Sequence, residues 1–146
     1  MIKKAKIISD GGAIQNPGPA GIGVIIKIEN KKEVVKTYSK YIGEATNNEA
    51  EYRALIFGLS ELKKILGKKI AKMTEVECFS DSKLLVSQLN GKYKIKEKKL
   101  FPLFIQIWNL KIDFKNVKFI YLEREENLAD RLVKEALKSR PQNHLF

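Results

Sequence analysis

Alternating apolar and polar residues predict that the first third of the chain forms a sheet. Residues 3–10 predict a strand that becomes apolar on both sides before it ends at Asp10. Isoleucine and valine occupy every second position between residues 21 and 29, which predicts a second strand. A polar turn leads to a third strand over residues 33–42, so the second and third strands are expected to form an antiparallel hairpin.

Turn-forming residues fill the segment between the first two strands. Gly11 and Gly12 allow the chain to turn freely after the first strand. Asn16-Pro17-Gly18 is typical of a type II turn, in which proline fixes the first corner and glycine accepts a positive φ at the second. We therefore expect a glycine-rich connection between these strands.

A helical period begins at residue 46 and predicts an amphipathic helix that is capped by Thr46 or Asn47 and ends near Gly67. Glu51 lies on its apolar face, in line with Leu55, Gly58, Leu62 and Leu66. Glu49 lies about 200° around the helix axis from this position, where solvent is expected. Burying a carboxylate is costly unless it is paired or binds a metal, so Glu51 is predicted to have a functional partner.

Strands and helices alternate in the second half of the chain. A strand over residues 75–80 is expected to deliver Asp81, and helices are expected over residues 82–89, 100–112 and 125–138, with a strand over 117–122. Trp108 is predicted to be a core residue. The pattern predicts an α/β fold with antiparallel and parallel strands. Acids at strand ends and helix starts can converge in such a fold: Asp10, Glu51, Asp81 and Asp130.

Composition favours a nucleic-acid partner for this chain. Its 146 residues carry a net charge of +11, which suits a polyanion, although lysine-rich surfaces also serve solubility alone. A hydrophobic fraction of 44% is ordinary for a globular protein, and we expect residues 1–146 to form one domain. We expect a monomer with no obligate protein partner.

The chain is expected to act in the cytoplasm, away from membranes. No apolar run approaches the roughly 20 residues of a membrane span, and no secretory signal is evident at the N-terminus. Cys78 is the only cysteine, so no intrachain disulfide can form, which fits a reducing compartment.

Four short motifs resemble type 1 ribonuclease H, in the order in which that family carries them. They are Asp10-Gly-Gly-Ala with Asn16-Pro-Gly-Pro, then Thr46-Asn-Asn-Glu-Ala-Glu51, then Phe79-Ser-Asp81-Ser, and Glu126-Asn127-Leu-Ala-Asp130. Each motif is weak by itself, because Asp-Gly and Asn-Pro-Gly are common turns. Together with the predicted elements around them, they give a specific signal over nearly the whole chain.

The resemblance implies a five-stranded mixed sheet, three strands of it antiparallel, flanked by helices. It also implies endonucleolytic cleavage of the RNA strand in RNA–DNA hybrids, leaving 3′-hydroxyl and 5′-phosphate ends. The family's four metal-binding acids fall on Asp10, Glu51, Asp81 and Asp130. Two Mg²⁺ ions, for which Mn²⁺ can substitute, would be bridged by Asp10, with Glu51 and Asp81 on the nucleophile side and Asp130 on the other.

Each acid also has a structural interpretation when it is considered alone. Asp10 could be a turn residue and Asp81 a helix N-cap, while Asp130 could complement a helix dipole. Glu51 is hardest to explain in this way because it lies on the apolar face of its helix. The combination favours the metal site.

Residues for substrate contact are also implied by the resemblance. The family places the asparagine of its Asn-Pro-Gly turn near the RNA 2′-hydroxyls, which falls on Asn16, and Gly11 and Gly12 would permit close backbone approach. The start of the predicted helix suits a phosphate or base edge, through Thr46, Asn47 and Asn48. Plain N-capping is the alternative role for Thr46.

The sequence departs from many members of the family at two places. They carry a histidine before the last aspartate, whereas this chain has Arg124 there and its only histidine is His144. Arg124 is expected either to replace that histidine, as in an archaeal-like branch, or to form an ion pair with Glu125 or Glu126. Some members also insert a long basic handle, which residues 90–99 replace here as a short basic patch or a solvated loop.

Two other classes of protein share these features in part. Integrases, transposases and junction resolvases also use clustered carboxylates and Mg²⁺, but the Thr-Asn-Asn and Asn-Pro-Gly motifs belong to the hybrid-cleaving family. A non-catalytic nucleic-acid-binding module is the third possibility, and the presence of all four acids counts against it.

Overall fold

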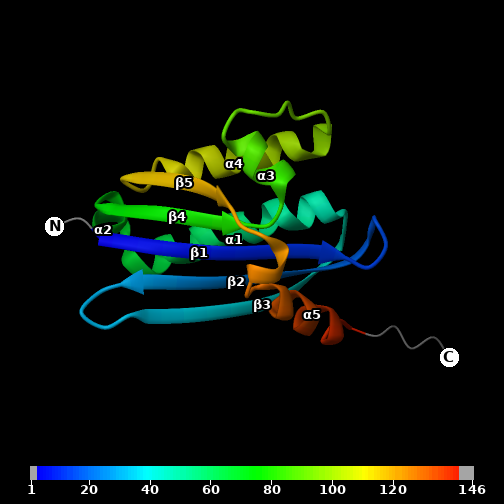
Figure 1. The fold of residues 1–146 in the computed structure, drawn as a ribbon, viewed down its shortest axis with the longest axis horizontal. Helices are drawn as coiled ribbons and strands as arrows, with labels where there is room; N and C mark the ends of the chain where they lie inside the picture. The colour runs from blue at the N-terminus through cyan, green and yellow to red at the C-terminus, as the bar shows by residue number, and fades with distance from the viewer. Residues whose placement is uncertain (1–2, 142–146) are drawn as a thin grey trace.

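Five strands form a single mixed sheet in the order β3-β2-β1-β4-β5 (Figure 1). The computed structural model describes residues 3–141, so His144 lies outside the described residues. β2 pairs antiparallel with β1 and β3, whereas β4 runs parallel to β1 and β5 parallel to β4. The expected five-stranded mixed sheet is confirmed, with strands β1 (Lys3–Ala13), β2 (Gly18–Glu29), β3 (Val34–Ala45), β4 (Thr74–Ser80) and β5 (Asn116–Tyr121).

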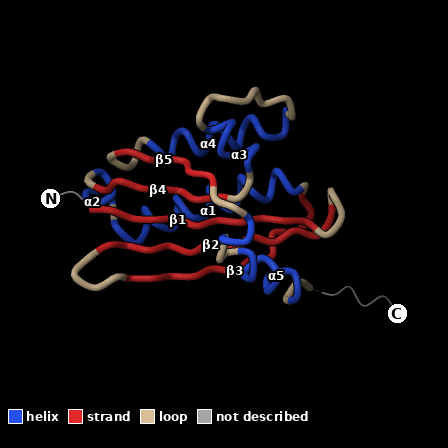
Figure 2. Tube along the Cα trace, in the orientation of Figure 1, coloured by secondary structure: helices blue, strands red, loops and turns tan. Residues whose placement is uncertain are grey.

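Helices cover both faces of the sheet, as Figures 1 and 2 show. α1 packs on one face against β1 and β2 and is itself contacted by α2 and α4, whereas α5 packs on the other face against β2 and β3. Among residues 3–141 no helix is both long and apolar enough to span a membrane. The helices are α1 (Asn47–Leu66), α2 (Lys68–Lys72), α3 (Lys83–Leu89), α4 (Phe101–Lys111) and α5 (Asp130–Lys138), with 3₁₀ turns at Lys98–Leu100 and Arg124–Glu126.

The apolar face of α1 forms the centre of the core, as its period predicts. Leu55, Leu59 and Leu62 are buried with Ile7 and Val24 in one cluster between this helix and the sheet. Each fully buried leucine stabilises the fold by about 1.5–3 kcal/mol relative to an exposed one. Glu51 is thereby held at the N-terminal end of a rigid, well-packed helix.

Glycine in β2 lets α5 approach the opposite face of the sheet closely. A Cβ added at Gly23 would lie 2.5 Å from the carbonyl oxygen of Ala129 and 2.7 Å from Cβ of Leu132. Gly23 is also the strand partner of Asp10. The missing side chain at Gly23 thus allows the start of α5, with Asp130, to lie beside Asp10.

β1 and β2 extend further than the sequence predicts. β1 continues through Gly11 and Gly12 to Ala13, which pairs with Ala20, and Ile14 donates its N–H to the Pro19 carbonyl at 2.8 Å. The predicted type II turn is wrong, because the Asn16–Pro17 peptide bond is cis and Gly18 does not have a positive φ. A Cβ at Gly18 would collide with the carbonyl oxygen of Ile14, so this glycine is required by packing.

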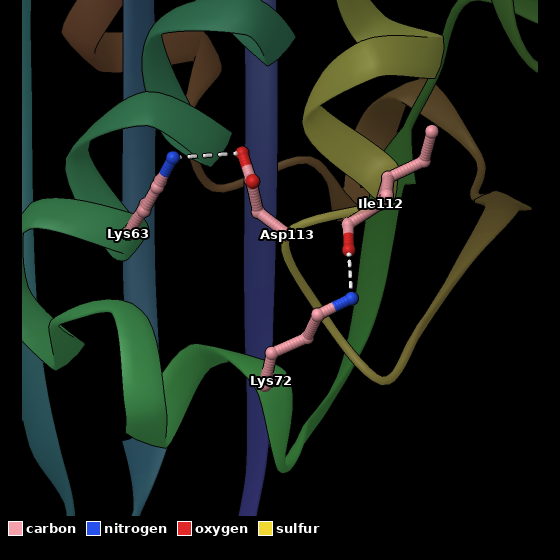
Figure 3. A network of polar contacts seen from close by, with 4 residues as sticks. All are labelled: Lys63, Lys72, Ile112 and Asp113. Atoms are coloured by element: carbon pink, nitrogen blue, oxygen red, sulfur yellow. Dashed lines mark hydrogen bonds and ion pairs between the residues drawn. The ribbon is translucent and has the colours of Figure 1, made fainter.

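A short helix, α2, occupies what the sequence suggests is only a lysine-rich connection. Figure 3 shows Lys72 of α2 and Lys63 of α1 reaching the two residues that directly follow α4, Ile112 and Asp113. Lys72 donates to the Ile112 carbonyl at 2.8 Å, and Lys63 of α1 pairs with Asp113 at 3.0 Å. Cations at a helix C-terminus satisfy its free carbonyls and its dipole, so these contacts fasten α4 to α1 and α2.

Trp108 is 45% exposed, so its predicted place in the core is wrong. α4 turns Ile107 inward, and its outer face carries Trp108 with three other exposed apolar side chains, Phe101, Ile105 and Ile112. The Trp108 ring stacks on Phe104 with 5.7 Å between centroids, and Lys111 Nζ lies 3.9 Å above it. These contacts hold the ring flat on the surface of its own helix.

Candidate active site

Three carboxylates converge at the end of the parallel strands. Asp10, Glu51 and Asp81 each offer one oxygen, and these oxygens all lie within 4.8 Å of one another. The register of the strands explains the first pair: Ser9 of β1 is opposite Ser80 of β4, so Asp10 and Asp81 follow side by side. Such a cluster of hard oxygen donors is a fitting site for a divalent cation.

Glu51 is tied to β1 by a backbone hydrogen bond. The N–H of Gly11 donates to Glu51 Oε1 at 2.7 Å. A Cβ at Gly11 would overlap the backbone of Ala50 and lie 2.7 Å from the Glu51 nitrogen, so only glycine fits there. Gly11 and Gly12 both line the cavity beside the acids, and the close approach made by Gly11 is to α1.

A cavity of about 410 Å³ opens over these acids and includes Asp130, Arg124 and Lys134 in its lining. Asp130 is the first residue of α5 and is not part of the three-residue cluster of the described residues. Its carboxylate pairs with Lys134 at 3.1 Å. The structure therefore brings all four predicted acids to one cavity, three of them in mutual contact range and the fourth at its edge.

Burial and the nearby negative charges raise the pKa values of the three clustered acids, Asp10, Glu51 and Asp81. The pKa of Asp10 rises from 3.8 to about 7, chiefly because the group is buried and then because Asp81 and Asp130 are close. The pKa of Glu51 is raised well above its ordinary value, by burial and then by Asp10 and Asp81. Among residues 3–141, Asp10 and Glu51 form no ion pair, although buried carboxylates in a purely structural role require a cationic partner.

Asp81 has a different environment from the other two acids of the cluster. Burial raises its pKa, but a hydrogen bond from Asn127 and the nearby Arg124 guanidinium oppose that shift. Arg124 is exposed and lines the cavity beside the acids. Among the described residues it forms no ion pair with Glu125 or Glu126, which was the alternative expected for it.

Asn127 is a positioning residue that sequence reasoning includes in a motif but does not assign to the site. Its side chain is 5% exposed and donates to the Ser9 carbonyl at 3.1 Å, while its oxygen accepts from the Ala129 N–H at 3.0 Å. These bonds lie directly before α5. The helix begins at Asp130, so its predicted start at residue 125 is wrong. Asn127 thereby fixes Asp130 relative to the Asp10 strand.

Two of the predicted substrate-contact amides brace each other. Asn16 Oδ1 accepts from the Asn47 N–H at 2.9 Å, and Asn47 Oδ1 accepts from the Ala13 N–H at 2.8 Å. Both side chains are exposed, and their NH₂ groups remain available to a ligand. The loop after β1 and the start of α1 therefore form one preorganised polar surface beside the acids.

Thr46 caps α1, and Asn48 contacts a second surface. The Thr46 hydroxyl accepts from the Glu49 N–H at 3.1 Å, and the Glu49 carboxylate accepts from the Thr46 N–H at 3.0 Å, which forms a capping box. This is the alternative role expected for Thr46, and it explains why Glu49 is partly covered. Asn48 instead donates to Glu97 Oε1 at 2.8 Å.

Comparison with known proteins places the chain in a family. A family model described as reverse transcriptase-like matches residues 9–136. LC11-RNase H1, solved in complex with an RNA/DNA hybrid, is 46% identical, with a TM-score of 0.83 over 92% of this chain and 96% of that one. This chain is a type 1 ribonuclease H family member.

Other ribonucleases H support this assignment. The N-terminal RNase H domain of Rv2228c from Mycobacterium tuberculosis is 36% identical, with a TM-score of 0.83 over 94% of this chain and 95% of that one. Ribonuclease HI of Halobacterium salinarum is 33% identical over 129 residues, which are 88% of this chain and 61% of that protein. The chain spans 37% of the length of the bifunctional protein Rv2228c, to which it is 37% identical over 141 residues.

Proposed function

We propose that this ribonuclease H family member hydrolyses the RNA strand of RNA–DNA hybrids, leaving 3′-hydroxyl and 5′-phosphate ends. The observation that carries this proposal is the close grouping of Asp10, Glu51 and Asp81 in a cavity that also holds Asp130. We also propose that it acts as a monomer in the cytoplasm, where its buried free thiol, Cys78, suits a reducing environment.

The donor set fits Mg²⁺, with Mn²⁺ as a substitute. All the candidate ligand atoms are carboxylate oxygens, and no histidine or thiol lies among the lining residues described. Asp10, Glu51 and Asp81 would hold one ion, and Asp10 with Asp130 a second. Two such ions, when bound, supply activation of the attacking water and stabilisation of the leaving oxygen.

Side chains around the cluster would orient the nucleic acid. Asn16 and Asn47 present amide donors next to the acids, where sugar hydroxyls or base edges of the RNA strand could be recognised. Arg124 places a permanent positive charge at the cavity. Because guanidinium does not lose its proton at ordinary pH, Arg124 would stabilise charge on the phosphate and would not transfer a proton.

A basic segment extends this surface beyond Asn48. Residues 92–99 carry five lysines. Part of this segment, including Tyr93, lines a cavity of about 580 Å³ together with Asn48. Lysines of this kind bind phosphates of either strand without regard to sequence. We propose that this segment follows the DNA strand in place of a longer handle.

Cleavage of a hybrid whose RNA strand is labelled would test the proposed function. With Mg²⁺ the wild-type protein should cut the RNA of an RNA–DNA duplex and spare RNA–RNA and DNA–DNA duplexes of the same sequence. Asp81→Asn should reduce the rate by at least about a hundredfold, because a charged ligand is lost. Tight binding without cleavage in both Mg²⁺ and Mn²⁺ would reject the enzyme and favour a binding module, and preferred cleavage of branched DNA would favour a resolvase.

Arg124→Ala should lower kcat by about tenfold to a hundredfold, because the cavity loses its cation beside the reacting phosphate. It should also raise the pKa of Asp81, since Arg124 now lowers it, so the acid limb of the pH–rate profile should move to higher pH. Arg124→Lys keeps the charge and should restore most of the pH effect. An unchanged kcat and pH profile for Arg124→Ala would rule out a role for this residue.

A further inference from the structure

Glu97 is the only acid in the basic segment 92–99, and it faces a predicted substrate contact. Its Oε1 accepts a hydrogen bond of 2.8 Å from Asn48 Nδ2, although the two residues are 49 positions apart. Among residues 3–141, neither Glu97 nor any lysine of this segment takes part in an ion pair. Its carboxylate is therefore engaged by an amide while the lysines beside it remain free.

The basic segment is held in this position by its backbone. The Ser87 carbonyl accepts from the N–H groups of Lys92 and Tyr93 at 2.8 and 3.2 Å, and the Gln88 side chain donates to the Lys94 carbonyl at 3.3 Å. Gln88 is itself buried and accepts from the Tyr52 hydroxyl at 2.7 Å. The chain from Ser87 to Lys94 is thus anchored to α1 and α3, and Glu97 lies three residues beyond it.

Glu97 and Asn48 line the same cavity as three lysines, Lys92, Lys94 and Lys96. Three lysines and an amide in one cavity would suit an anion. Among the described residues that line this cavity, Glu97 is the only one with a carboxylate. A nucleic-acid strand that enters the cavity brings its own acceptors and phosphates. It must compete with Glu97 for the Asn48 amide and must also approach a like charge.

We propose that Glu97 sets the affinity for the hybrid by occupying the Asn48 amide in the free protein and releasing it when a strand enters. This inference rests on the proposed function, because the competing ligand is the hybrid. The carboxylate acts as an internal competitor and lowers affinity. It also lowers the affinity for other polyanions, because any phosphate that enters the cavity meets the same competition from Glu97.

Binding of a fluorescently labelled, uncleavable hybrid, measured by anisotropy with Ca²⁺ in place of Mg²⁺, would test this proposal. Glu97→Ala removes both the charge and the hydrogen bond and should tighten binding about fivefold. Glu97→Gln keeps an acceptor and loses only the charge, so it should tighten binding about twofold. In turnover assays with Mg²⁺ the gain should appear in KM and not in kcat.

Matched controls separate this effect from a change in net charge. Glu29→Gln changes the total charge by the same amount, but Glu29 is the last residue of β2. The affinity of this variant for the hybrid should differ from that of the wild type by less than about 1.5-fold at 0.15 M salt. In an Asn48→Ala background, Glu97→Ala and Glu97→Gln should become equivalent, because the hydrogen bond they distinguish is gone.

Two outcomes need to be told apart in this experiment. If Glu97→Ala and Glu97→Gln both bind the hybrid as the wild type does, or more weakly, then Glu97 is not a competitor and the inference is wrong. If instead the wild-type protein binds the hybrid no better than it binds duplex DNA and duplex RNA, the proposed function itself fails. Thermal melting of each variant shows whether the segment remains folded.

Discussion

Asp10→Asn is expected to abolish hybrid cleavage and at the same time to stabilise the metal-free protein. The loss of activity should be about a thousandfold, because Asp10 is the acid shared by both proposed ion positions. The gain in stability follows from removing one of three crowded carboxylates, two of which have strongly raised pKa values. In EDTA at pH 8 the gain should be about 2 kcal/mol, or about 5 °C in Tm.

The stability gain should depend on pH in a defined direction. Asp10 titrates near 7 in the folded protein and near 3.8 in the unfolded chain, so between these values the folded state holds a proton that the unfolded state releases. Wild-type stability therefore falls as pH rises through this window. The difference between Asp10→Asn and wild type should be small at pH 4 and reach its maximum above pH 7.

Mg²⁺ provides the control for this prediction. A cation bound only by the folded protein should raise the wild-type Tm and leave that of Asp10→Asn nearly unchanged. Thermal melts with EDTA and with Mg²⁺, across pH 4 to 8, are sufficient to measure both effects. A variant that is no more stable than wild type at pH 8 in EDTA would show that the acids do not repel one another in the way their burial implies.

Gly11→Ala should destabilise the fold by about 3 kcal/mol and lower the Tm by about 10 °C. The added methyl group would overlap the backbone of Ala50, which belongs to the first turn of α1 and cannot move aside as a flexible side chain could. The helix would have to shift away from β1. That shift would lengthen the bond between the Gly11 N–H and Glu51, so cleavage should also fall by at least about tenfold.

Gly12→Ala is the matched control for stability, because its methyl group would meet only Val133 Cγ1, at an ordinary contact distance of 3.7 Å. Its Tm should stay within about 2 °C of wild type. Urea or thermal melts of the two variants measure the difference. Equal stabilities would mean that α1 can retreat from β1 at little cost, and the site would then be less rigid than its hydrogen bonds suggest.

The sheet and the acid positions could be predicted because each depends on a strong local pattern. The period of α1 places Glu51 among leucines, and the apolar strands before Asp10 and Asp81 bring these acids to neighbouring strand ends. Those features are set by the intrinsic periods of strands and helices. Asp130 has a weaker local signal, its place near the start of the last predicted helix, and the resemblance to ribonuclease H then gave it a role as a metal ligand.

Other features depend on contacts between distant segments and could not be predicted in this way. Asn127 is recognised as a positioning residue only when the Ser9 carbonyl, 118 residues away, is found beside it. The Glu97 contact to Asn48 and the pairing of Gly11 with β2 are likewise tertiary. Trp108 was misplaced because the apolar residues of α4 surround the helix, and periodicity alone did not show which of them face the sheet.

The four acids lie at residues 10, 51, 81 and 130, so they are distributed over most of the chain. During synthesis the first three emerge well before Asp130, and the bonds of Asn127 that fix α5 need both β1 and the last connection. A chain in which α5 has not docked would therefore hold scattered carboxylates and would lack the proposed four-acid metal site. The proposed cleavage of RNA in hybrids would then be confined to molecules in which α5 has docked against β1 and β2.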